Sequence, residues 1–544
     1  MLVWDQNPAS VYEAVSIAAR QWPDRPFLQI LPETADVYGI AAGEITYGQM
    51  LGDADWLKAL YAKAGYRTGE RVFLLLENRP SFFAHWFALN ALGLIVVPVN
   101  PDLQSSELAY LASHSEPVLA IAIEKRRGGL ERAARDAGVN YAVIAPQDEP
   151  PPAPSGDVGA TGGIDRRTPA AMLYTSGTTG APKGCVLSNR YYIKLGEWYA
   201  GMGGACAIDT RGERMITPLP LFHMNAMAAS AMGMIGVGGC LITLDRFHPR
   251  TWWDSVRESR ATCLHYLGVM PSILMKAEPS GSDRDHCCSF GFGAGVDPKL
   301  HVPFEERFGI PLVEGWAMTE TGAGATLTNN IEPRKRGESC LGKAGAELQT
   351  KIVRDDGGDC DADEPGELLV RQAGDDPRDG FFSEYFKDAA ATAEAWEGGW
   401  FHTGDIVRRD DEGSFYFVDR KKNVIRRSGE NIAAVEVESV LMQHPDIRAA
   451  GVAAVPDSIR GDEVFACLVV DGERSEQRAL SLAAWALERM AYYKVPGYIA
   501  FVDALPLTGT QKIQRGELKS LAARLVDDPK TVNTIVMKKR QVAR

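Results

Sequence analysis

A polar, glycine-rich stretch from residue 174 to residue 184 constrains the fold of this chain more than any other segment. It reads Tyr-Thr-Ser-Gly-Thr-Thr-Gly-Ala-Pro-Lys-Gly and is flanked on both sides by short apolar runs. Its glycines allow sharp turns and a close approach of the backbone to a ligand. Its hydroxyl groups, backbone amides and lysine are suited to bind phosphate oxygens. The sequence therefore predicts two strands joined by a phosphate-binding loop. The residues expected to bind phosphate are Thr175, Ser176, Gly177, Thr178, Thr179, Gly180 and Lys183.

The spacing of this stretch differs from that of the common P-loop. The P-loop motif is G-x-x-x-x-G-K-[ST], placed between a strand and a helix. Here proline precedes Lys183, glycine follows it, and the next run is strand-like. A polar hairpin turn that binds no ligand is the other interpretation of the stretch taken alone, so further motifs have to decide between the two.

Length, charge and cysteine content exclude several classes of protein. A chain of 544 residues is too long for one ordinary hydrophobic core and predicts two or more domains. Acidic residues outnumber basic ones, 71 to 58, and this excess argues against broad binding to nucleic acids or anionic membranes. No C-x-x-C pair occurs, so neither a zinc site nor a disulfide framework is expected. The first residues do not resemble a signal peptide, and we expect a cytoplasmic protein.

The segment from Ala226 to Leu244 has no charged residue and is long enough to span a membrane. Glycines interrupt it at positions 233, 236, 238 and 239. We interpret it as a buried helix of small residues, a glycine turn and a strand from Cys240 to Leu244. We therefore expect no stable insertion into a membrane.

The periodicity of apolar residues predicts an α/β protein. Over residues 1 to about 145, apolar strand-like runs alternate with helical patterns, which is typical of a parallel sheet covered on both faces. The alternation resumes from residue 185 to about 330 and predicts a second sheet packed on the first. Short strands separated by hairpin turns follow at 337–376, and a compact α+β segment follows residue 422.

These patterns predict a large N-terminal domain and a small C-terminal one. The large domain is expected to contain two packed αβ sheets and a small β-rich subdomain, and the small domain is expected to be a mobile α+β unit. The predicted boundaries are 1–421 for the N-terminal domain, 422–530 for the C-terminal domain and 531–544 for a tail.

The stretch at 174–184 closely resembles the phosphate loop of the class I adenylate-forming enzymes. This superfamily includes acyl-CoA synthetases, adenylation domains of peptide synthetases and firefly luciferases. Four further stretches match it in the same order along the chain, so that the resemblance covers about residues 8 to 525. They are Gly291–Gly295, Glu314–Glu320, Gly399–Asp405 with Asp419 and Arg420 beyond it, and Leu505–Ile513.

The resemblance implies a nucleotide site and a role for each matching residue. The expected nucleotide-binding residues beyond the phosphate loop are Gly293, Ala294, Gly295, Glu314, Gly315, Trp316, Thr319, Asp405 and Arg420. Trp316 would stack on adenine, Asp405 would accept both ribose hydroxyls, and Thr319 would contact the α-phosphate. Glu320 and Thr175 would hold Mg²⁺, a hard cation that prefers oxygen ligands.

The resemblance also implies residues for the chemistry and for movement of the small domain. Lys512 matches the catalytic lysine, Lys422 the hinge between the domains, and Gly429 a loop that lines the pantetheine tunnel of coenzyme A. Three positions depart from the family pattern. Relatives have tyrosine and glycine where this chain has Trp316 and Ala317, and glycine where it has Gln511.

The resemblance implies an ATP-dependent carboxylic acid–CoA ligase, with ATP, Mg²⁺ and coenzyme A as its small-molecule partners. A carboxylate and ATP would give acyl-AMP and pyrophosphate, and the CoA thiol would then give acyl-CoA and AMP. His223 stands where peptide-synthetase domains place an aspartate for an amino group, so an acyl or aryl acid is favoured. The run Ala-Tyr-Tyr-Lys-Val-Pro496 is similar to crotonobetaine/carnitine-type CoA ligases. A homodimer is expected from the family.

Two other functions remain open at this point. A stand-alone acyl-AMP ligase would load a carrier protein instead of coenzyme A, and a luciferase-like monooxygenase would oxidise the adenylate. The acid itself is not defined by the sequence. The pocket expected near His223, Met224, Asn225, Val269, Met270, Gly295 and Gly315 favours a small or aromatic acid, because Trp316 would shorten it.

Overall fold

The first of three sheets carries the predicted phosphate loop at the end of one of its strands. The computed structural model describes residues 1–154, 163–175, 181–354, 356–420, 424–506, 513 and 515–538. Among them, seven strands form this first sheet. In it β3 to β7 run parallel, β8 is antiparallel to β7, and β18 is antiparallel to β8. Its order is β18 (Glu384–Tyr385), β8 (Lys183–Ser188), β7 (Pro169–Thr175), β4 (Ile95–Pro98), β3 (Arg71–Leu75), β5 (Leu119–Ala122) and β6 (Ala142–Ile144).

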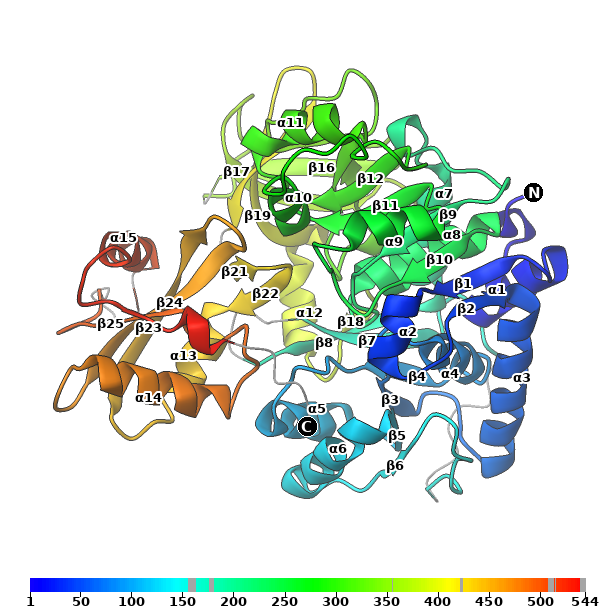
Figure 1. Cartoon of the computed structure of the whole chain (residues 1–544), viewed down its shortest axis with the longest axis horizontal. Coiled ribbons are helices and arrows are strands. Elements are labelled where there is room, and N and C mark those ends of the chain that lie inside the picture. Colours follow the sequence, from blue (N-terminus) through cyan, green and yellow to red (C-terminus); the bar gives the residue numbers. More distant parts are fainter. Residues whose placement is uncertain are drawn as a thin grey trace.

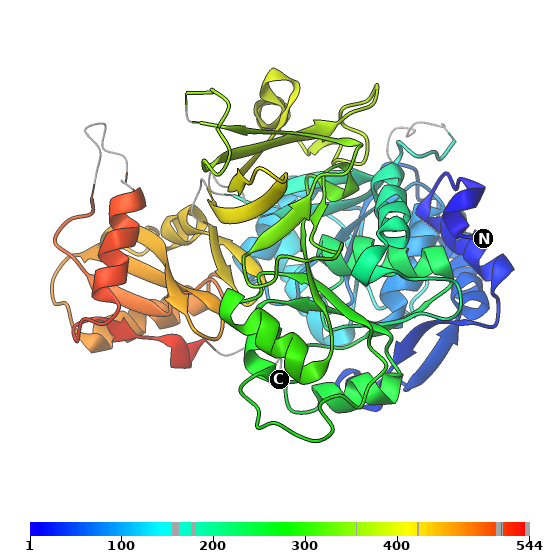
Figure 2. The same ribbon diagram turned by 90° about the horizontal axis from the view of Figure 1, so that it is seen from above.

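The second sheet joins the predicted second αβ unit to the predicted β-rich subdomain. Thirteen strands belong to it within the described ranges. Their order is β16 (Leu348–Val353), β17 (Gly366–Gln372), β19 (Phe401–Arg409), β20 (Ser414–Arg420), β15 (Cys340–Lys343), β14 (Leu327–Thr328), β13 (Leu312–Trp316), β12 (Phe290–Ala294), β11 (Cys263–Leu267), β9 (Arg214–Thr217), β10 (Cys240–Thr243), β1 (Pro26–Ile30) and β2 (Gly43–Thr46). The strands from β13 to β1 run parallel, and β14 to β20 continue antiparallel into a separate lobe (Figure 2).

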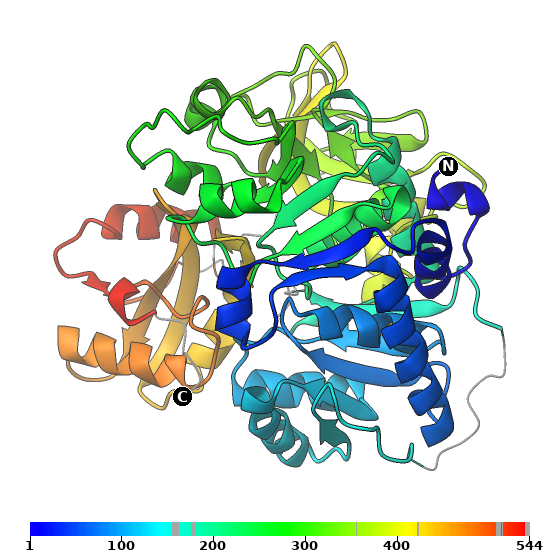
Figure 3. The ribbon, with the colours of Figure 1, turned by 45° about the vertical axis from the view of Figure 1, so that its right-hand side comes forward.

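The N-terminal strands occupy a place that the sequence pattern does not reveal. The alternation over residues 1 to about 145 predicts one parallel sheet, but β1 and β2 lie in the second sheet, where Leu28 is in register with Leu241 of β10. Figure 3 shows these blue strands beside the green ones. A run of apolar residues identifies a strand but does not identify its partner, which lies more than 200 residues away along the chain.

Helices fill the space between the two sheets and cover their outer faces. Within the described residues the α-helices are α1 (Val11–Gln21), α2 (Pro32–Tyr38), α3 (Tyr47–Ala64), α4 (Pro80–Asn90), α5 (Ser105–Ser115), α6 (Glu124–Ala137), α7 (Asn189–Gly201), α8 (Ala231–Val237), α9 (Trp252–Ser259), α10 (Val269–Leu274), α11 (Pro298–Phe308), α12 (Ala389–Ala395), α13 (Ala434–Leu441), α14 (Glu476–Leu487) and α15 (Arg515–Leu525). One continuous core cluster contains residues of α1, α4, α7 and α8 together with strands of both sheets.

The uncharged segment from Ala226 to Leu244 forms the elements that the sequence predicts. A π-helix, η3 (Asn225–Ser230), continues into α8, the chain turns at Gly238 with φ of 65°, and β10 follows. Every residue of α8 is buried, because the helix is packed between two layers, and this explains why it is apolar on all sides. None of the described helices combines the length and the apolar character needed to cross a membrane.

The C-terminal part of the chain forms a smaller domain with its own sheet and core (Figure 1). Its described strands are β22 (Glu430–Ala433), β21 (Val424–Arg427), β24 (Gly461–Val470), β23 (Ile447–Asp457), β25 (Tyr498–Phe501) and β26 (Val532–Asn533). The predicted tail therefore does not begin at residue 531, because β26 pairs with β25 and Lys538 is fully buried against Glu463.

The two domains meet through a buried lysine. Lys494 of the small domain lies 2.6 Å from Glu107 of the large domain and 2.7 Å from Glu436 of its own domain. Burial lowers the pKa of Lys494, but the two carboxylates outweigh this effect and raise it, so the lysine stays charged. Beside it, the Asn100 amide donates a hydrogen bond to the Tyr493 hydroxyl over 3.0 Å. These contacts fix the face that the small domain presents to the large one.

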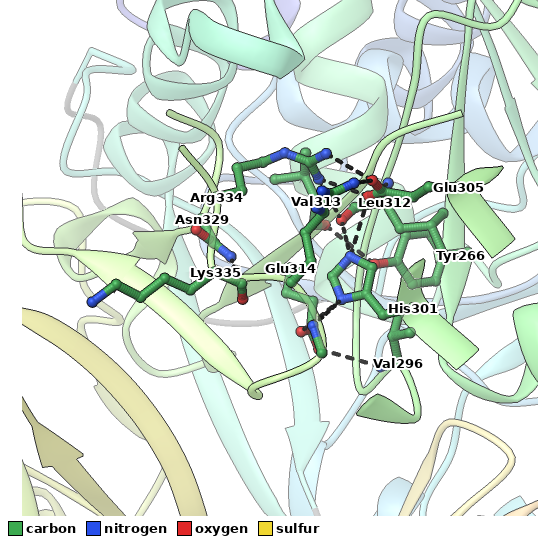
Figure 4. A network of polar contacts seen from close by, with 12 residues as sticks. Tyr266, Val296, His301, Glu305, Leu312, Val313, Glu314, Asn329, Arg334 and Lys335 are labelled. Atoms are coloured by element: carbon green, nitrogen blue, oxygen red, sulfur yellow. Dashed lines mark hydrogen bonds and ion pairs between the residues drawn. The ribbon is translucent and has the colours of Figure 1, made fainter. Parts of the chain in front are cut away.

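A buried polar network supports β13, the strand that carries the predicted adenine-stacking motif (Figure 4). Arg334 donates two hydrogen bonds to Glu305, at 2.8 and 3.0 Å, and a third to the carbonyl of Leu312 at the start of β13. His301 donates from Nε2 to the same carbonyl over 2.8 Å. Burial raises the pKa of Glu305, but hydrogen bonds from His301 and Arg334 outweigh it and lower the pKa to about 2.

We expect Arg334→Met to destabilise the large domain. The variant leaves the buried carboxylate of Glu305 without its bidentate partner, and breaking a buried ion pair costs about 3 kcal/mol. The midpoint of thermal unfolding (Tm) should fall clearly below that of the wild type at pH 7. Arg354→Met, which breaks a half-exposed pair with Glu364, should cost less than about 1 kcal/mol and serves as the control.

The pH dependence follows from the lowered pKa of Glu305. The stabilisation is complete above its ordinary value of 4.5 and is lost as the pH falls toward about 2. The difference in Tm between wild type and Arg334→Met should therefore become smaller as the pH falls from 4.5 toward about 2. A difference that stays constant from pH 7 to pH 3 would contradict the role given to this pair.

Candidate active site

The predicted nucleotide-binding residues come together at the carboxyl ends of parallel strands from both sheets. Thr175 ends β7 of the first sheet, Gly295 follows β12, and Trp316 ends β13 of the second sheet. Ligands of open α/β sheets bind at this edge, where loops after neighbouring strands converge. Motifs that are far apart in the sequence thus lie around one place.

The centre of this place is the carboxylate of Glu320, which is 7% exposed. The hydroxyl of Thr175 donates a hydrogen bond to Glu320 Oε1 over 3.2 Å, and the hydroxyl of Tyr385 donates to the same oxygen over 3.1 Å. Lys183 lies over the ring of Tyr385, with Nζ 4.8 Å from its centroid. The structure therefore brings together the two predicted metal-binding residues and the lysine of the predicted phosphate loop.

The donor set at Glu320 fits Mg²⁺. One carboxylate and one hydroxyl are oxygen ligands, and Mg²⁺ is usually held by one or two carboxylates together with water and substrate phosphates. Because the hydroxyl hydrogen of Thr175 takes part in the hydrogen bond to Glu320, the lone pairs of the Thr175 hydroxyl oxygen are directed toward other partners, such as a cation. Glu320 and Thr175 would hold the cation between the ends of the two sheets.

Trp316 and Asp405 are linked directly. The indole N–H of Trp316 donates a hydrogen bond to Asp405 Oδ2 over 2.8 Å, and both side chains are buried. Asp405 lies in β19, and its Cα is in register with that of Arg420 on β20. The predicted adenine-stacking ring, the predicted ribose-binding carboxylate and the backbone of Arg420 are thus neighbours.

Backbone and small residues form the wall beside Trp316. Gly293 and Ala294 lie in β12, and Gly295 follows with φ of 77°. A Cβ on Gly315 would lie 2.5 Å from the ring of Phe292, so no larger residue fits at this position.

The side chain of Glu314 is turned into the protein. Glu314 Oε1 accepts a hydrogen bond from the amide of Val296 over 3.2 Å, and Oε2 lies 3.9 Å from His301 Nδ1 (Figure 4). Burial raises the pKa of Glu314. Through Val296 this residue holds the turn that follows β12.

The small domain reaches this site with the hairpin between β21 and β22. Gly429 has φ of 89°, and a Cβ there would lie 2.1 Å from Leu267 at the end of β11. Glu430 Oε2 lies 3.6 Å from His223 Nε2, an atom that is buried without a hydrogen-bond partner among the described residues. The hairpin that carries the predicted pantetheine-binding glycine therefore meets the predicted acyl-pocket histidine through Glu430, across the domain boundary.

A polar network lies behind the expected acyl pocket. His265 Nε2 accepts from the hydroxyl of Tyr199 over 2.6 Å, and its Nδ1 contacts Ser230 Oγ at 2.8 Å and Asn225 Oδ1 at 2.9 Å. Burial lowers the pKa of His265 to about 3, so the ring is neutral with its proton on Nδ1. Asn225 is thereby fixed beside His223, whereas Met270, expected in the pocket, is buried in the core around α9 and α11.

Thr319 is half-buried in the turn between Trp316 and Glu320. The structure does not describe several other predicted site residues. Ser176, Gly177, Thr178, Thr179, Gly180, Lys422 and Lys512 lie outside the described residues. Sequence reasoning missed Tyr385, which belongs to none of the motifs singled out, and Glu430, which directly follows Gly429 but was not assigned a role.

Comparison with known proteins identifies the family. The model of the AMP-binding enzyme family matches residues 15–377, and that of the AMP-binding enzyme C-terminal domain matches residues 436–512. Crotonobetaine/carnitine–CoA ligases from Escherichia coli strain UMN026 and from Shigella sonnei strain Ss046 are each 30% identical to this chain over 518 residues. These alignments cover 90% of this chain and 98% of each relative.

The chain belongs to the AMP-binding enzyme family. It is similar in structure to o-succinylbenzoate CoA synthetase from Bacillus subtilis, with a TM-score of 0.78, 23% identity, and coverage of 93% of this chain and 98% of that one. A malonyl-CoA ligase solved with methylmalonyl-CoA and AMP gives a TM-score of 0.72 at 25% identity, covering 89% of this chain and 97% of that one.

These findings confirm the predicted fold and enzyme class. This member of the AMP-binding enzyme family is an AMP-forming acid–CoA ligase that uses ATP, Mg²⁺ and coenzyme A, with a large N-terminal and a small C-terminal α/β domain. The carrier-loading and monooxygenase alternatives are not favoured, because the relatives named here are CoA ligases or CoA synthetases.

We expect Trp316→Phe to weaken nucleotide binding. Phenylalanine keeps an aromatic face but removes the N–H that orients Asp405, and an unmet hydrogen bond at a buried carboxylate costs about 1–3 kcal/mol. The dissociation constant for AMP, measured by calorimetry, should rise about tenfold. Trp56→Phe, at a side chain that is 55% exposed, is the control and should leave the constant unchanged. Equal AMP affinity for Trp316→Phe and wild type would contradict the role of the hydrogen bond.

Proposed function

We propose that this CoA ligase activates a small or aromatic carboxylic acid at the edge where β7, β12 and β13 end. The observation that carries this proposal is the cluster of Glu320, Thr175 and Lys183 next to the Trp316–Asp405 pair. Together these residues offer oxygen ligands for a metal, a cation for phosphate and a carboxylate for ribose, which supports the proposal. The residue assignments below belong to this proposal.

In the first half-reaction, an oxygen of the substrate carboxylate attacks the α-phosphorus of ATP, and pyrophosphate leaves toward the 175–183 loop. Negative charge builds up on phosphate oxygens, so catalysis consists mainly of positioning and electrostatic stabilisation. Bound Mg²⁺ would neutralise part of that charge. Lys183 and Lys512 supply positive charge to the phosphates, Thr319 contacts the α-phosphate, and Asp405 holds the ribose, assisted by Arg420.

In the second half-reaction, the thiol of coenzyme A attacks the acyl carbonyl, the bond from carbonyl carbon to phosphate oxygen breaks, and AMP leaves. We propose that the small domain, which begins at residue 422 and includes β26, turns about Lys422 between the two steps relative to the large domain, residues 1–421. The position of Gly429 against Leu267 and of Glu430 beside His223 supports the view that the structure has the arrangement for this thioester-forming step.

The acid is proposed from the lining of the pocket. Trp316 and the Phe292 ring under Gly315 favour a short or flat acyl group. By their names, the relatives reported above act on crotonobetaine and carnitine, and we include an acid of similar size in this proposal. A cytoplasmic location and a homodimer remain parts of this proposal that rest on the expectations from sequence.

The test is pyrophosphate release with ATP and a panel of carboxylic acids, each measured with and without coenzyme A. We expect at least one small or aromatic acid to give sustained turnover that requires coenzyme A and yields AMP and acyl-CoA. Glu320→Gln should lower this turnover at least tenfold, because the amide is a poorer metal ligand than a carboxylate. ATP cleavage to ADP, or sustained turnover without coenzyme A, would overturn the proposal.

A further inference from the structure

Tyr385 is a residue of the site that no sequence motif identifies. It lies in β18, which pairs antiparallel with β8 so that Tyr385 is in register with Cys185, just after the phosphate loop. Hydrogen bonds from the amide of Ser383 to Val186 and from that of Phe386 to Gly184, both 2.8 Å, hold the strand on either side. The backbone of Tyr385 is therefore fixed to the strand that follows the phosphate loop.

The same segment holds Glu320 at two points. The amide of Phe382 donates to the backbone carbonyl of Glu320 over 2.8 Å, and the hydroxyl of Tyr385 donates to its side-chain Oε1 over 3.1 Å. The Phe382 ring, 1% exposed, packs against the Tyr385 ring with centroids 4.7 Å apart. Main chain and carboxylate of Glu320 are thus positioned by one short stretch of chain.

The two oxygens of the Glu320 carboxylate differ in their surroundings. Oε1 accepts from both Thr175 and Tyr385, and neither of these hydroxyls donates to Oε2. Two hydroxyl donors on one oxygen fix the rotation of the carboxylate.

The ring of Tyr385 has a second contact that concerns the phosphates. Lys183 Nζ lies 4.8 Å from the ring centroid, a cation–π distance. Lys183 forms no ion pair with any carboxylate in the described parts of the chain. Its ammonium group is therefore held by an aromatic face, which does not neutralise its charge toward a phosphate.

We propose that Tyr385 is a positioning residue that orients Glu320 toward Mg²⁺ through its hydroxyl and Lys183 toward the pyrophosphate through its ring. This inference rests on the proposed function and deepens it, since it assigns Glu320 Oε2 to the cation and Oε1 to the two hydroxyls. Tyr385 touches neither the acyl group nor the ribose in this scheme. Replacing Tyr385 should therefore weaken the binding of metal and phosphate and leave the binding of the other substrates unchanged.

The first experiment measures metal binding and does not depend on turnover. Mn²⁺ replaces Mg²⁺ as a spectroscopic probe, and its free concentration is followed by electron paramagnetic resonance with α,β-methylene-ATP bound to the enzyme. We expect Tyr385→Phe to weaken Mn²⁺ binding about tenfold or more, the range found when partners of metal ligands are removed. Tyr385→Leu should also weaken binding of pyrophosphate itself, because it removes the ring beneath Lys183.

Tyr416→Phe is the matched control. The hydroxyl of Tyr416 also donates to a carboxylate, Asp410 Oδ2, over 2.7 Å, but away from the site. It should leave Mn²⁺ binding unchanged even though it removes the same kind of hydrogen bond. Thermal unfolding shows whether each variant is folded. If Tyr385→Phe is not folded, Mn²⁺ binding by Tyr385→Leu, or Mn²⁺ binding in the presence of added pyrophosphate, is compared with that of the wild type.

The kinetic experiment separates a positioning role from a merely structural one. Tyr385→Phe should raise the Mg²⁺ concentration needed for half-maximal pyrophosphate release about tenfold, with the KM of the acid and of coenzyme A unchanged. Conversion of added acyl adenylate to acyl-CoA should be unaffected. Wild-type Mn²⁺ affinity in Tyr385→Phe would overturn the inference. If the wild type binds Mn²⁺ with nucleotide but forms no acyl-CoA, the proposed function fails while Tyr385 is still tested by the Mn²⁺ measurement.

Discussion

The hydrogen bonds on the carboxylate of Glu320 are the interaction on which the architecture of this site depends. Glu320 follows β13 of the second sheet, Thr175 ends β7 of the first, and Tyr385 is pinned to β8. A buried carboxylate is stable only when its hydrogen bonds are satisfied, so these three segments must be in place together. The carboxyl ends of the two sheets are thereby held together, and the proposed phosphate, ribose and adenine contacts lie around the place where they meet.

The small domain completes this arrangement from one side. The charged group of Lys494 between Glu107 and Glu436 is expensive to bury and is stable only with both partners, which favours one defined approach of the domains. In that approach the Gly429 hairpin lies against Leu267 and Glu430 lies beside His223. A ligase that performs two reactions at one site needs a small domain that can present a different surface for each reaction. The small domain has its own core, which allows it to move as a unit.

Much of the fold and part of the site could be predicted from the sequence. Strands such as β3 and β16–β17 follow from apolar runs and turn residues, and the grouping of Thr175, Glu320, Trp316 and Asp405 follows from ordered motifs. The place of β1 beside β10 could not be predicted, because strand pairing depends on the whole sheet and not on local pattern. Tyr385 was missed for the same reason: its hydroxyl meets Glu320 only because β18 pairs with β8, and the local sequence around this tyrosine does not indicate that pairing.

The measurement that tests the central claim most directly is the fate of a labelled carboxylate oxygen. The acid with the highest turnover is labelled with ¹⁸O in both carboxyl oxygens and converted with ATP, Mg²⁺ and coenzyme A, and the AMP is analysed by mass spectrometry. If the carboxylate attacks the α-phosphorus and the thiol later breaks the bond from carbon to oxygen, one labelled oxygen must appear in each AMP. Unlabelled AMP, or label in inorganic phosphate, would show that no acyl adenylate forms and would contradict the account given for this site.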